Sequence, residues 1–386
     1  MTDLLPKAAW TARTDLAALV AALGAGHVRW VGGAVRDTLL GAAVKDIDAA
    51  TVLPPRDVVA ACAAAGLKTV PTGIEHGTVT VVLAGGPVEV TTLRHDVATD
   101  GRRATVAFAQ DWREDAARRD FTINALYADP VTLEIHDYFG GLADLAARRV
   151  RFIGDAHQRI REDHLRILRY FRFQARFGQA VDPAAEGACA DLAATLKGLS
   201  RERVGQEMMT LLALPDPAPT VARMAELGVL AVVLPEADPA ALTALVAQER
   251  AQGVAPVALR RLAALIPADP ALAEQIASRF RLSGSQRKRL ACAARRMEGA
   301  PHALAYRLGL EEARDALLLT GHDARSLDGF AAPVFPLKGG QIVARGVAAG
   351  PQVARILQAV EARWVEEGFP DAARVEALLD AELGAP

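Results

Sequence analysis

Two aspartates, Asp46 and Asp48, are separated by one residue and follow the glycine pair Gly32 and Gly33. Side chains at positions i and i+2 of a strand point to the same face, so these carboxylates can offer two hard oxygen ligands to Mg²⁺. An Asp-x-Asp pair alone is more often part of a solvated strand or turn than of a metal site. The glycines and Arg36 favour the metal interpretation, because they can bring backbone and guanidinium groups to the phosphates of a nucleotide.

Glu89 is the candidate for a third carboxylate. It lies in the β-branched run 88–93, and the similar run 77–83 is joined to it by an Ala-Gly-Gly-Pro link, which predicts a hairpin. If the strand that holds Asp46 and Asp48 neighbours this hairpin, Glu89 can join the two aspartates. Three carboxylates would complete a two-metal site, in which one ion activates a hydroxyl and the other stabilises a pyrophosphate leaving group.

A polar stripe within residues 160–177 is the second group that could do chemistry. We predict a helix there, on which Asp163, Arg166, Arg169 and Arg172 recur every three residues. A solvated basic face is the ordinary explanation of such a stripe. An arginine and an aspartate one helical turn apart can also bind the Watson–Crick edge of a base, and a row of arginines suits a triphosphate or an RNA backbone.

The elements that position these residues follow from the pattern of apolar residues. Residues 28–31 predict a short strand, followed by the glycine turn, a brief helix and a second strand that holds both aspartates. Residues 94–111 are polar and show no period, which predicts a mobile loop, whereas residues 115–129 predict a helix. From residue 158 onward helical patterns dominate. The chain therefore predicts an α+β fold, with a mixed α/β head of about 140 residues before an all-helical remainder.

Composition limits the remaining possibilities. The 386 residues are 51% hydrophobic with a formal net charge of −2, so total charge indicates no particular partner. The three cysteines, Cys62, Cys189 and Cys292, form no CxxC pair, which argues against a structural zinc site or a disulfide framework and favours a reducing compartment. The sequence shows no export signal and no long apolar segment, so we expect no membrane contact and a cytoplasmic protein.

Seven motifs, in this order, closely resemble those of the class II tRNA nucleotidyltransferase and bacterial poly(A) polymerase family. The resemblance runs from about residue 28 to residue 207, with a weaker match in the tail at residues 336–351. The motifs are Gly32-Gly-Ala-Val-Arg-Asp37, Asp46-Ile-Asp48, Val88-Glu-Val-Thr-Thr-Leu-Arg94, Arg118-Arg-Asp-Phe-Thr-Ile-Asn-Ala125, Gly140-Gly-Leu-Ala-Asp-Leu145, Glu162-Asp-His-Leu-Arg-Ile-Leu-Arg169 and Leu199-Ser-Arg-Glu-Arg-Val204.

The resemblance implies a fold, a division into domains and a role for each matching residue. A polymerase β-like nucleotidyltransferase head (1–140) would precede a helical neck that selects the nucleotide (141–207), a helical RNA-binding body (208–300) and a helical tRNA-binding tail (301–386). The implied roles are metal binding and catalysis for Asp46 and Asp48, catalysis for Glu89, triphosphate binding for Gly32, Gly33 and Arg36, sugar and phosphate contacts for Arg118, Arg119 and Asp120, base selection for Asp163 and Arg166, and phosphate support for Arg169 and Arg172.

The resemblance also implies an activity, template-independent addition of CCA to tRNA 3′ ends from CTP and ATP with two Mg²⁺ ions. Residues 94–111 keep their full length and the Asp100-Gly-Arg102-Arg103 run, which favours an enzyme that adds the terminal A, so CCA-adding and A-adding remain open. A poly(A) polymerase is less favoured, because residues 72–78 lack that activity's basic signature. An inactive RNA-binding protein of the same fold is the alternative from another class.

The partners that we expect are nucleoside triphosphates and the acceptor end and T arm of tRNA; the sequence indicates no protein partner. Basic residues at 260–261, 279–289 and 295–296 could contact RNA backbone. An ordinary solvated helix face explains each of these groups equally well.

Overall fold

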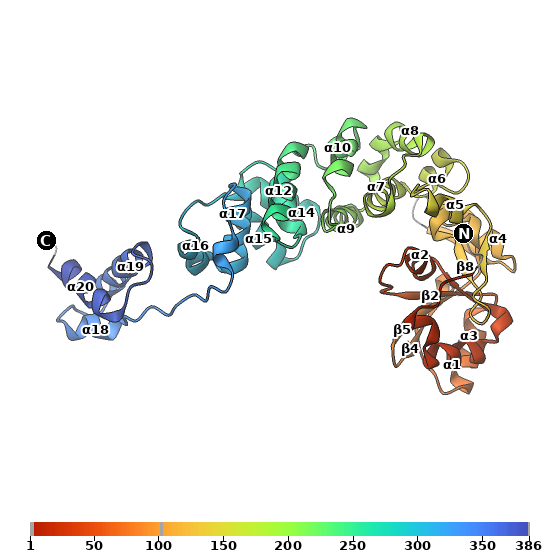
Figure 1. Cartoon of the computed structure of the whole chain (residues 1–386), viewed down its shortest axis with the longest axis horizontal. Coiled ribbons are helices and arrows are strands. Elements are labelled where there is room, and N and C mark those ends of the chain that lie inside the picture. The colour runs from red at the N-terminus through yellow and green to blue at the C-terminus, as the bar shows by residue number, and fades with distance from the viewer. Residues whose placement is uncertain (1–3, 101–102, 385–386) are drawn as a thin grey trace. The chain divides into compact units, whose positions relative to one another are not determined.

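The structure is a computed structural model that describes residues 4–100 and 103–384 (Figure 1). The chain divides into two compact units. The first comprises residues up to Leu211 together with Thr220–Pro235, and the second comprises Leu212–Pro219 and residues from Glu236 onward.

A mixed seven-stranded sheet forms the centre of the first unit, in the order β3-β4-β5-β2-β1-β8-β9. The pair β2 and β5 is parallel, and the other paired neighbours are antiparallel. The strands are β1 (Val28–Val31), β2 (Ile47–Thr51), β3 (Lys68–Gly73), β4 (Thr78–Leu83), β5 (Gly86–Thr92), β8 (Leu126–Ala128) and β9 (Ile135–Asp137).

Short helices pack on this sheet. Helix α3 contacts β3, β4 and β5, as well as α1, and α2 contacts β1, β2 and β8. Proline at the first position of α3 suits a helix start, because the ring presets φ and the missing N–H would have had no partner there. The head helices are α1 (Thr14–Leu23), α2 (Gly33–Leu39), α3 (Pro55–Ala64), α4 (Trp112–Ala117) and α5 (Gly141–Ala146).

The register of β2 against β5 places two of the predicted carboxylates, Asp48 and Glu89, side by side, although they are far apart in the sequence. Asp48 is the Cα partner of Glu89 in this parallel pair, which confirms that the two strands are neighbours. The predicted hairpin is also confirmed, because β4 pairs with β5 from Thr78 opposite Thr91 to Leu83 opposite Gly86. One detail was wrong: Asp46 precedes the first residue of β2 and is not part of the strand.

The prediction of an aperiodic loop over residues 94–111 was wrong. Strand β6 (Arg94–Asp100) pairs antiparallel with β7 (Arg103–Phe108) in a separate two-stranded sheet. This ladder is made by backbone groups, so the polarity of its side chains did not reveal it. Within the predicted Asp100-Gly-Arg102-Arg103 run, residues 101 and 102 lie outside the described part of the chain, and so do the side chains of Asp100 and Arg103.

The predicted helix over residues 115–129 ends much earlier, at Ala117. A short 3₁₀ turn (Thr122–Asn124) and strand β8 follow it. Phe121 adopts an extended conformation and forms a bridge with Phe152, whose ring centroid lies 5.0 Å away. Burial of this aromatic pair outweighs the helical preference of the neighbouring residues.

The predicted helix over residues 160–177 is broken in two, α6 (Ala156–Glu162) and α7 (Arg166–Phe177). Asp163 is extended, with φ −149° and ψ 104°. Its carboxylate accepts a hydrogen bond from the Leu165 N–H and its carbonyl accepts one from the Arg166 N–H, so it starts α7 much as an N-cap residue would. Asp163 is therefore not part of the arginine-bearing helix.

Helices account for the rest of both units, and no strand follows β9 in the described chain, as the sequence predicted. None of the described helices is both long and apolar enough to cross a lipid bilayer. The helices are α8 (Pro183–Asp191), α9 (Arg201–Leu212), α10 (Ala218–Glu226), α11 (Val229–Val233), α12 (Pro239–Gln252), α13 (Ala258–Leu265), α14 (Pro270–Arg279), α15 (Gly284–Ala294), α16 (Pro301–Leu308), α17 (Leu310–Leu319), α18 (Gly339–Ala344), α19 (Pro351–Glu366) and α20 (Ala372–Leu383).

A buried ionic network joins three helices of the second unit, α12, α13 and α17. Arg260 donates to Asp315 and to Glu249 at 2.7 Å each, and Arg261 donates to Glu249 at 2.8 Å. Arg260 and Arg261 are 1% and 2% exposed. The suggestion that these two arginines contact RNA was therefore wrong, because both guanidiniums are buried and paired with carboxylates inside the second unit.

Candidate active site

An open cavity of about 790 Å³ in the first unit gathers most of the predicted site residues. Its lining includes nine arginines and four aspartates, a mixture that suits a polyanion bound beside a cation. The lining residues are Gly33, Arg36, Asp46, Asp48, Arg94, Arg118, Arg119, Asp120, Asn124, Asp163, Leu165, Arg166, Arg169, Arg172, Phe173, Arg176 and Arg203.

The glycine pair forms the predicted turn between β1 and α2. Gly32 has a φ of 70° and a ψ of −123°, which a residue with a side chain rarely adopts. A Cβ atom at Gly32 would lie 3.6 Å from Arg119 Nη1, which is an ordinary contact distance, so the backbone conformation is what favours glycine here. Gly33 lines the cavity, whereas Gly32 is not among its lining residues.

Asp46 and Asp48 both line the cavity. Burial raises the pKa of Asp48, and the negative charges of Glu89 and Asp46 raise it further, against the opposing effect of Arg119. A divalent cation would relieve this repulsion, and carboxylate oxygens are the donors that Mg²⁺ prefers, so the pair fits that ion. Glu89 is exposed and does not line the cavity. Across residues 4–100 and 103–384, no group of three or more His, Cys, Asp or Glu side chains is arranged to hold a metal ion.

Arg36 is buried beside the glycine turn. It donates to Asp37 Oδ1 at 2.8 Å and to Asn124 Oδ1, and its guanidinium lies 4.3 Å from the centre of the Phe177 ring. Burial lowers its pKa, and the charge of Asp37 partly offsets this effect. These contacts fix the orientation of a cation at the point where the sequence predicted a phosphate.

Asp115 holds two arginines against the cavity, and we did not predict it. It is 1% exposed and accepts hydrogen bonds from Arg118 Nε at 2.8 Å, Arg119 Nη2 at 3.2 Å and the Tyr127 hydroxyl at 2.6 Å. Burial alone would raise the pKa of Asp115, but the two arginines hold it at about 2. The spacing was a usable signal, since a carboxylate three and four residues before two arginines lies on their side of a helix.

Asp120 pairs with Arg169 across the boundary between the head and α7. Arg169 Nε donates to Asp120 Oδ2 at 2.9 Å, and Asn124 Nδ2 donates to Asp120 Oδ1 at 2.9 Å. Burial opposes the charged form of Asp120, but Arg169 and Asn124 outweigh it and hold the pKa at about 2. This pair links the motif of residues 118–125 to the arginine-bearing helix.

Asp163 and Arg166 both line the cavity but are paired with other groups. Asp163 Oδ2 accepts from Arg203 Nη2 at 2.7 Å, and Arg166 Nη1 donates at 2.7 Å to Glu162 Oε2 and to the Arg159 carbonyl. These contacts hold each of the two side chains in place. Asp163 and Arg166 are bonded to other groups and not to each other through their side chains.

Eleven of the thirteen predicted site residues line this one cavity, and Gly32 and Glu89 do not. Six lining residues were missed: Arg94, Asn124, Leu165, Phe173, Arg176 and Arg203. The motifs of the resemblance include Arg94, Asn124, Leu165 and Arg203. Arg176 lies one turn after Arg172, so the sequence did carry a signal for these five. Nothing in the sequence set Phe173 apart from the packing residues of its helix.

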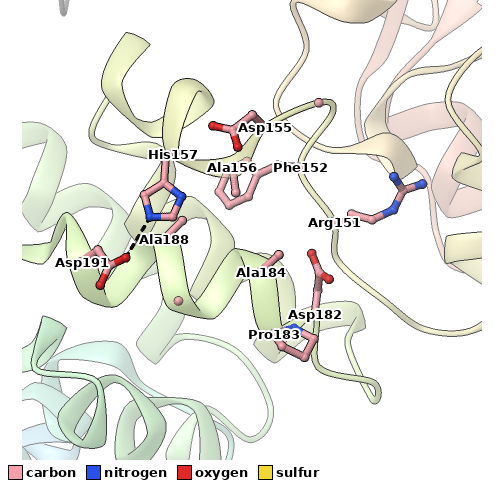
Figure 2. Close-up of a pocket in the computed structure, with 12 residues that line it drawn as sticks. Arg151, Phe152, Asp155, Ala156, His157, Asp182, Pro183, Ala184, Ala188 and Asp191 are labelled. Atoms are coloured by element: carbon pink, nitrogen blue, oxygen red, sulfur yellow. Dashed lines mark hydrogen bonds and ion pairs between the residues drawn. The ribbon is translucent and has the colours of Figure 1, made fainter.

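A second cavity of about 330 Å³ lies between residues 151–157 and helix α8 (Figure 2). Figure 2 shows His157 joined to Asp191, with Nε2 and Oδ2 2.9 Å apart, above a floor of small residues on α8. Asp155 and Asp182 also line it, and Arg151 is the one arginine among its lining residues. This excess of carboxylates would repel a triphosphate.

The mixed sheet, the aspartates beside a glycine turn and the arginine-lined cavity define a nucleotidyltransferase head domain. Residues 28–151 match a family model described as the poly(A) polymerase head domain, and residues 178–241 match one described as a probable RNA- and SrmB-binding site of polymerase A. These two matched regions resemble the domains of the class II tRNA nucleotidyltransferase and bacterial poly(A) polymerase family.

Several known proteins share long regions with this chain. It is 45% identical over 190 residues to the mitochondrial CCA tRNA nucleotidyltransferase 1 of Homo sapiens, a match that covers 48% of this chain and 44% of the relative. It is 41% identical over 201 residues to the CCA-adding enzyme of Geobacillus stearothermophilus, covering 52% and 48%. These matches thus span less than half the length of either relative.

Solved structures extend the similarity of fold to nearly the whole chain. The Bacillus stearothermophilus CCA-adding enzyme in complex with CTP has a TM-score of 0.74 at 28% identity, covering 96% of this chain and 97% of that one. The Thermotoga maritima CCA-adding enzyme complexed with tRNA has a TM-score of 0.70 at 21% identity, covering 95% and 94%. The second likeness supports the fold alone.

Proposed function

We propose that the protein is a template-independent nucleotidyltransferase that adds CCA to tRNA 3′ ends from CTP and ATP. The observation that carries this proposal is one cavity that brings together Asp46 and Asp48, the phosphate-binding candidates and the two base-selecting candidates. The names of the similar proteins support it, since they are called CCA-adding enzymes and CCA tRNA nucleotidyltransferases.

In this proposal Asp46 and Asp48 hold Mg²⁺, which when bound activates the 3′-hydroxyl and neutralises the pyrophosphate leaving group. Gly33 and Arg36 bind the triphosphate at the glycine turn, while Arg169 and Arg172 bind it from helix α7. Glu89, the strand partner of Asp48, adds negative charge beside the metal ligands, which strengthens their preference for a divalent cation.

Base selection belongs to Asp163 and Arg166. A carboxylate oxygen of Asp163 can accept from the exocyclic amine that cytosine and adenine share, and a free N–H of Arg166 can donate to a ring nitrogen or carbonyl. Glu162 and Arg203 hold these two side chains in place, so binding a base requires little further ordering.

The remaining assignments follow from the same proposal. Residues 1–140 carry the transfer chemistry, residues 141–207 select the nucleotide, and residues 208–300 and 301–386 bind the acceptor end and T arm of tRNA. Cys62, Cys189 and Cys292 are free thiols, as expected in the reducing cytoplasm, which we propose as the compartment.

The test is incubation of the purified protein with tRNA that lacks its 3′ end, labelled CTP or ATP, and Mg²⁺. We expect two C residues and one A residue to be added, and none when a chelator replaces Mg²⁺. Incorporation of A alone on tRNA ending in CC would instead identify an A-adding enzyme, and long A tails a poly(A) polymerase. Bound tRNA without any incorporation would refute the enzyme proposal.

A further inference from the structure

Phe173 is a lining residue of the cavity to which the proposed reaction gives no role. It lies in α7 and is 6% exposed. Three guanidiniums surround its ring: Arg172 at 4.7 Å, Arg36 at 5.3 Å and Arg169 at 5.7 Å from the ring centre. These cations come from two elements that are far apart in the sequence, α2 and α7.

Each of these arginines is also held by a carboxylate. Arg36 donates to Asp37 at 2.8 Å, Arg169 to Asp120 at 2.9 Å and Arg172 to Glu207 at 2.5 Å. A carboxylate engages the N–H edge of a guanidinium, whereas an aromatic ring attracts the cation through its negative face. Glu207 also lies 3.9 Å from Arg169, so it bridges the two arginines of α7, whereas Arg36 has a carboxylate of its own. Phe173 is the group that all three arginines share.

The ring itself is fixed by the core of the first unit. Its centre lies 5.2 Å from that of Phe121 and 5.7 Å from that of Phe177, and Phe121 is completely buried. Phe173 thus has little freedom to move, and the arginines around it take their mutual spacing from a rigid group.

We propose that Phe173 is a positioning residue for the polyphosphate part of the substrate. Its ring keeps Arg36, Arg169 and Arg172 at one spacing in the absence of ligand, although their like charges repel one another. The effect is independent of the base, so it acts equally on CTP and ATP. This proposal deepens the proposed function and rests on it for the identity of the nucleotide.

The experiment compares Phe173→Leu and Phe173→Met with the wild-type chain in magnesium-containing buffer. We expect the Kd for inorganic tripolyphosphate, measured by calorimetry, to rise about tenfold in both variants. In the transfer assay the KM for CTP and for ATP should rise by the same factor, with little change in kcat or in the order of C and A. Phe173→Tyr keeps an aromatic ring and should restore most of the affinity.

Phe171→Leu is the matched control, because it makes the same change two residues away on the same helix. Phe171 is 1% exposed and contacts the ring of Tyr170, with centroids 5.2 Å apart, and no cation lies over its ring in the described structure. It should lower thermal stability while leaving tripolyphosphate affinity unchanged.

Three results would overturn the proposal: no tripolyphosphate binding by the wild type, unchanged affinity in the folded Phe173 variants, or equal loss of affinity in Phe171→Leu. Failure of the proposed function has a different signature. Tripolyphosphate would still bind in a manner that depends on Phe173, but no nucleotide would be added to tRNA.

Discussion

Two cavities of the first unit are lined by residues close in sequence but are opposite in charge. Residues of the α6–α8 region contribute to both, yet one lining contains nine arginines and the other contains one. The larger cavity also contains the glycine turn and the two aspartates, whereas the smaller one has carboxylates and a histidine around a floor of small side chains (Figure 2). Space alone therefore does not distinguish a nucleotide site from a surface groove; the arrangement of charge does.

The charged groups also differ in how firmly they are held. In the larger cavity Arg118, Arg119 and Arg169 are each paired with a buried aspartate. In the smaller one His157 and Asp191 are 36% and 68% exposed, so solvent screens their interaction. Cations fixed before the ligand arrives bind it with less loss of entropy, which is the property that a transfer site needs.

Replacing Asp46 or Asp48 with alanine should produce the largest effect. We expect the transfer rate to fall by a factor of about 10³ or more, because the metal loses a ligand, while tRNA binding persists. Labelled-nucleotide incorporation and filter binding measure the two properties. Asp182→Ala, which removes a carboxylate from the smaller cavity, is the control, and an equal loss of rate in that variant would contradict the distinction between the cavities.

Replacing Arg166 with alanine should scramble the choice of nucleotide. We expect discrimination between the correct and an incorrect nucleotide to fall about 10- to 100-fold, since a side chain that donates to the base is lost. Competition between labelled nucleotides measures this ratio. Arg161→Ala, at an exposed position of α6, is the control. Unchanged preference in Arg166→Ala would refute the base-selecting role.

The Asp120–Arg169 pair should make stability depend on acidic pH. The pKa of Asp120 is about 2 in the folded chain against 3.8 for an unperturbed aspartate, so the pair stabilises the fold above pH 3.8 and this stabilisation is lost as pH falls towards 2. The contribution is on the order of 2 kcal/mol. Urea unfolding of the wild type and Asp120→Asn should differ most above pH 4, and the difference should shrink as the pH falls towards 2. A difference that is independent of pH would exclude this account.

The smallest effect is expected for Asp191→Ala in the smaller cavity. Because its pair with His157 is exposed, the free energy of unfolding should change by less than about 0.5 kcal/mol, and the KM for CTP should not change. Thermal unfolding and the transfer assay measure these quantities. A clear loss of activity would show that the smaller cavity takes part in the reaction after all.

Site residues whose role depends on their own residue type and on their spacing along the chain could be predicted from the sequence. The hairpin of β4 and β5 followed from two β-branched runs, and eleven site residues followed from motifs in a known order. Side-chain partners were not predictable in this way. Phe173 contributes through the three arginines around its ring, and those contacts depend on the tertiary structure.

The wrong predictions have a common physical cause. The polarity of a residue in the sequence does not reveal which backbone or side-chain group it will pair with in the fold. The β6–β7 hairpin was missed because its ladder consists of backbone hydrogen bonds, which form without a periodic side-chain pattern. Arg260 and Arg261 are charged but buried because Glu249 and Asp315 neutralise them. The break at Asp163 likewise depends on one side chain that caps the next helix. Each of these features requires a partner that a single sequence does not identify.

The parallel register of β2 and β5 has a consequence for how this protein can change in evolution. Insertions in the connection between the two strands leave Asp48 opposite Glu89, since the connecting residues do not set that pairing. One extra residue inside β5 before Glu89 would turn its carboxylate to the other face of the sheet. Related chains should therefore vary in length between residues 52 and 85 and keep a constant count from residue 86 to residue 89.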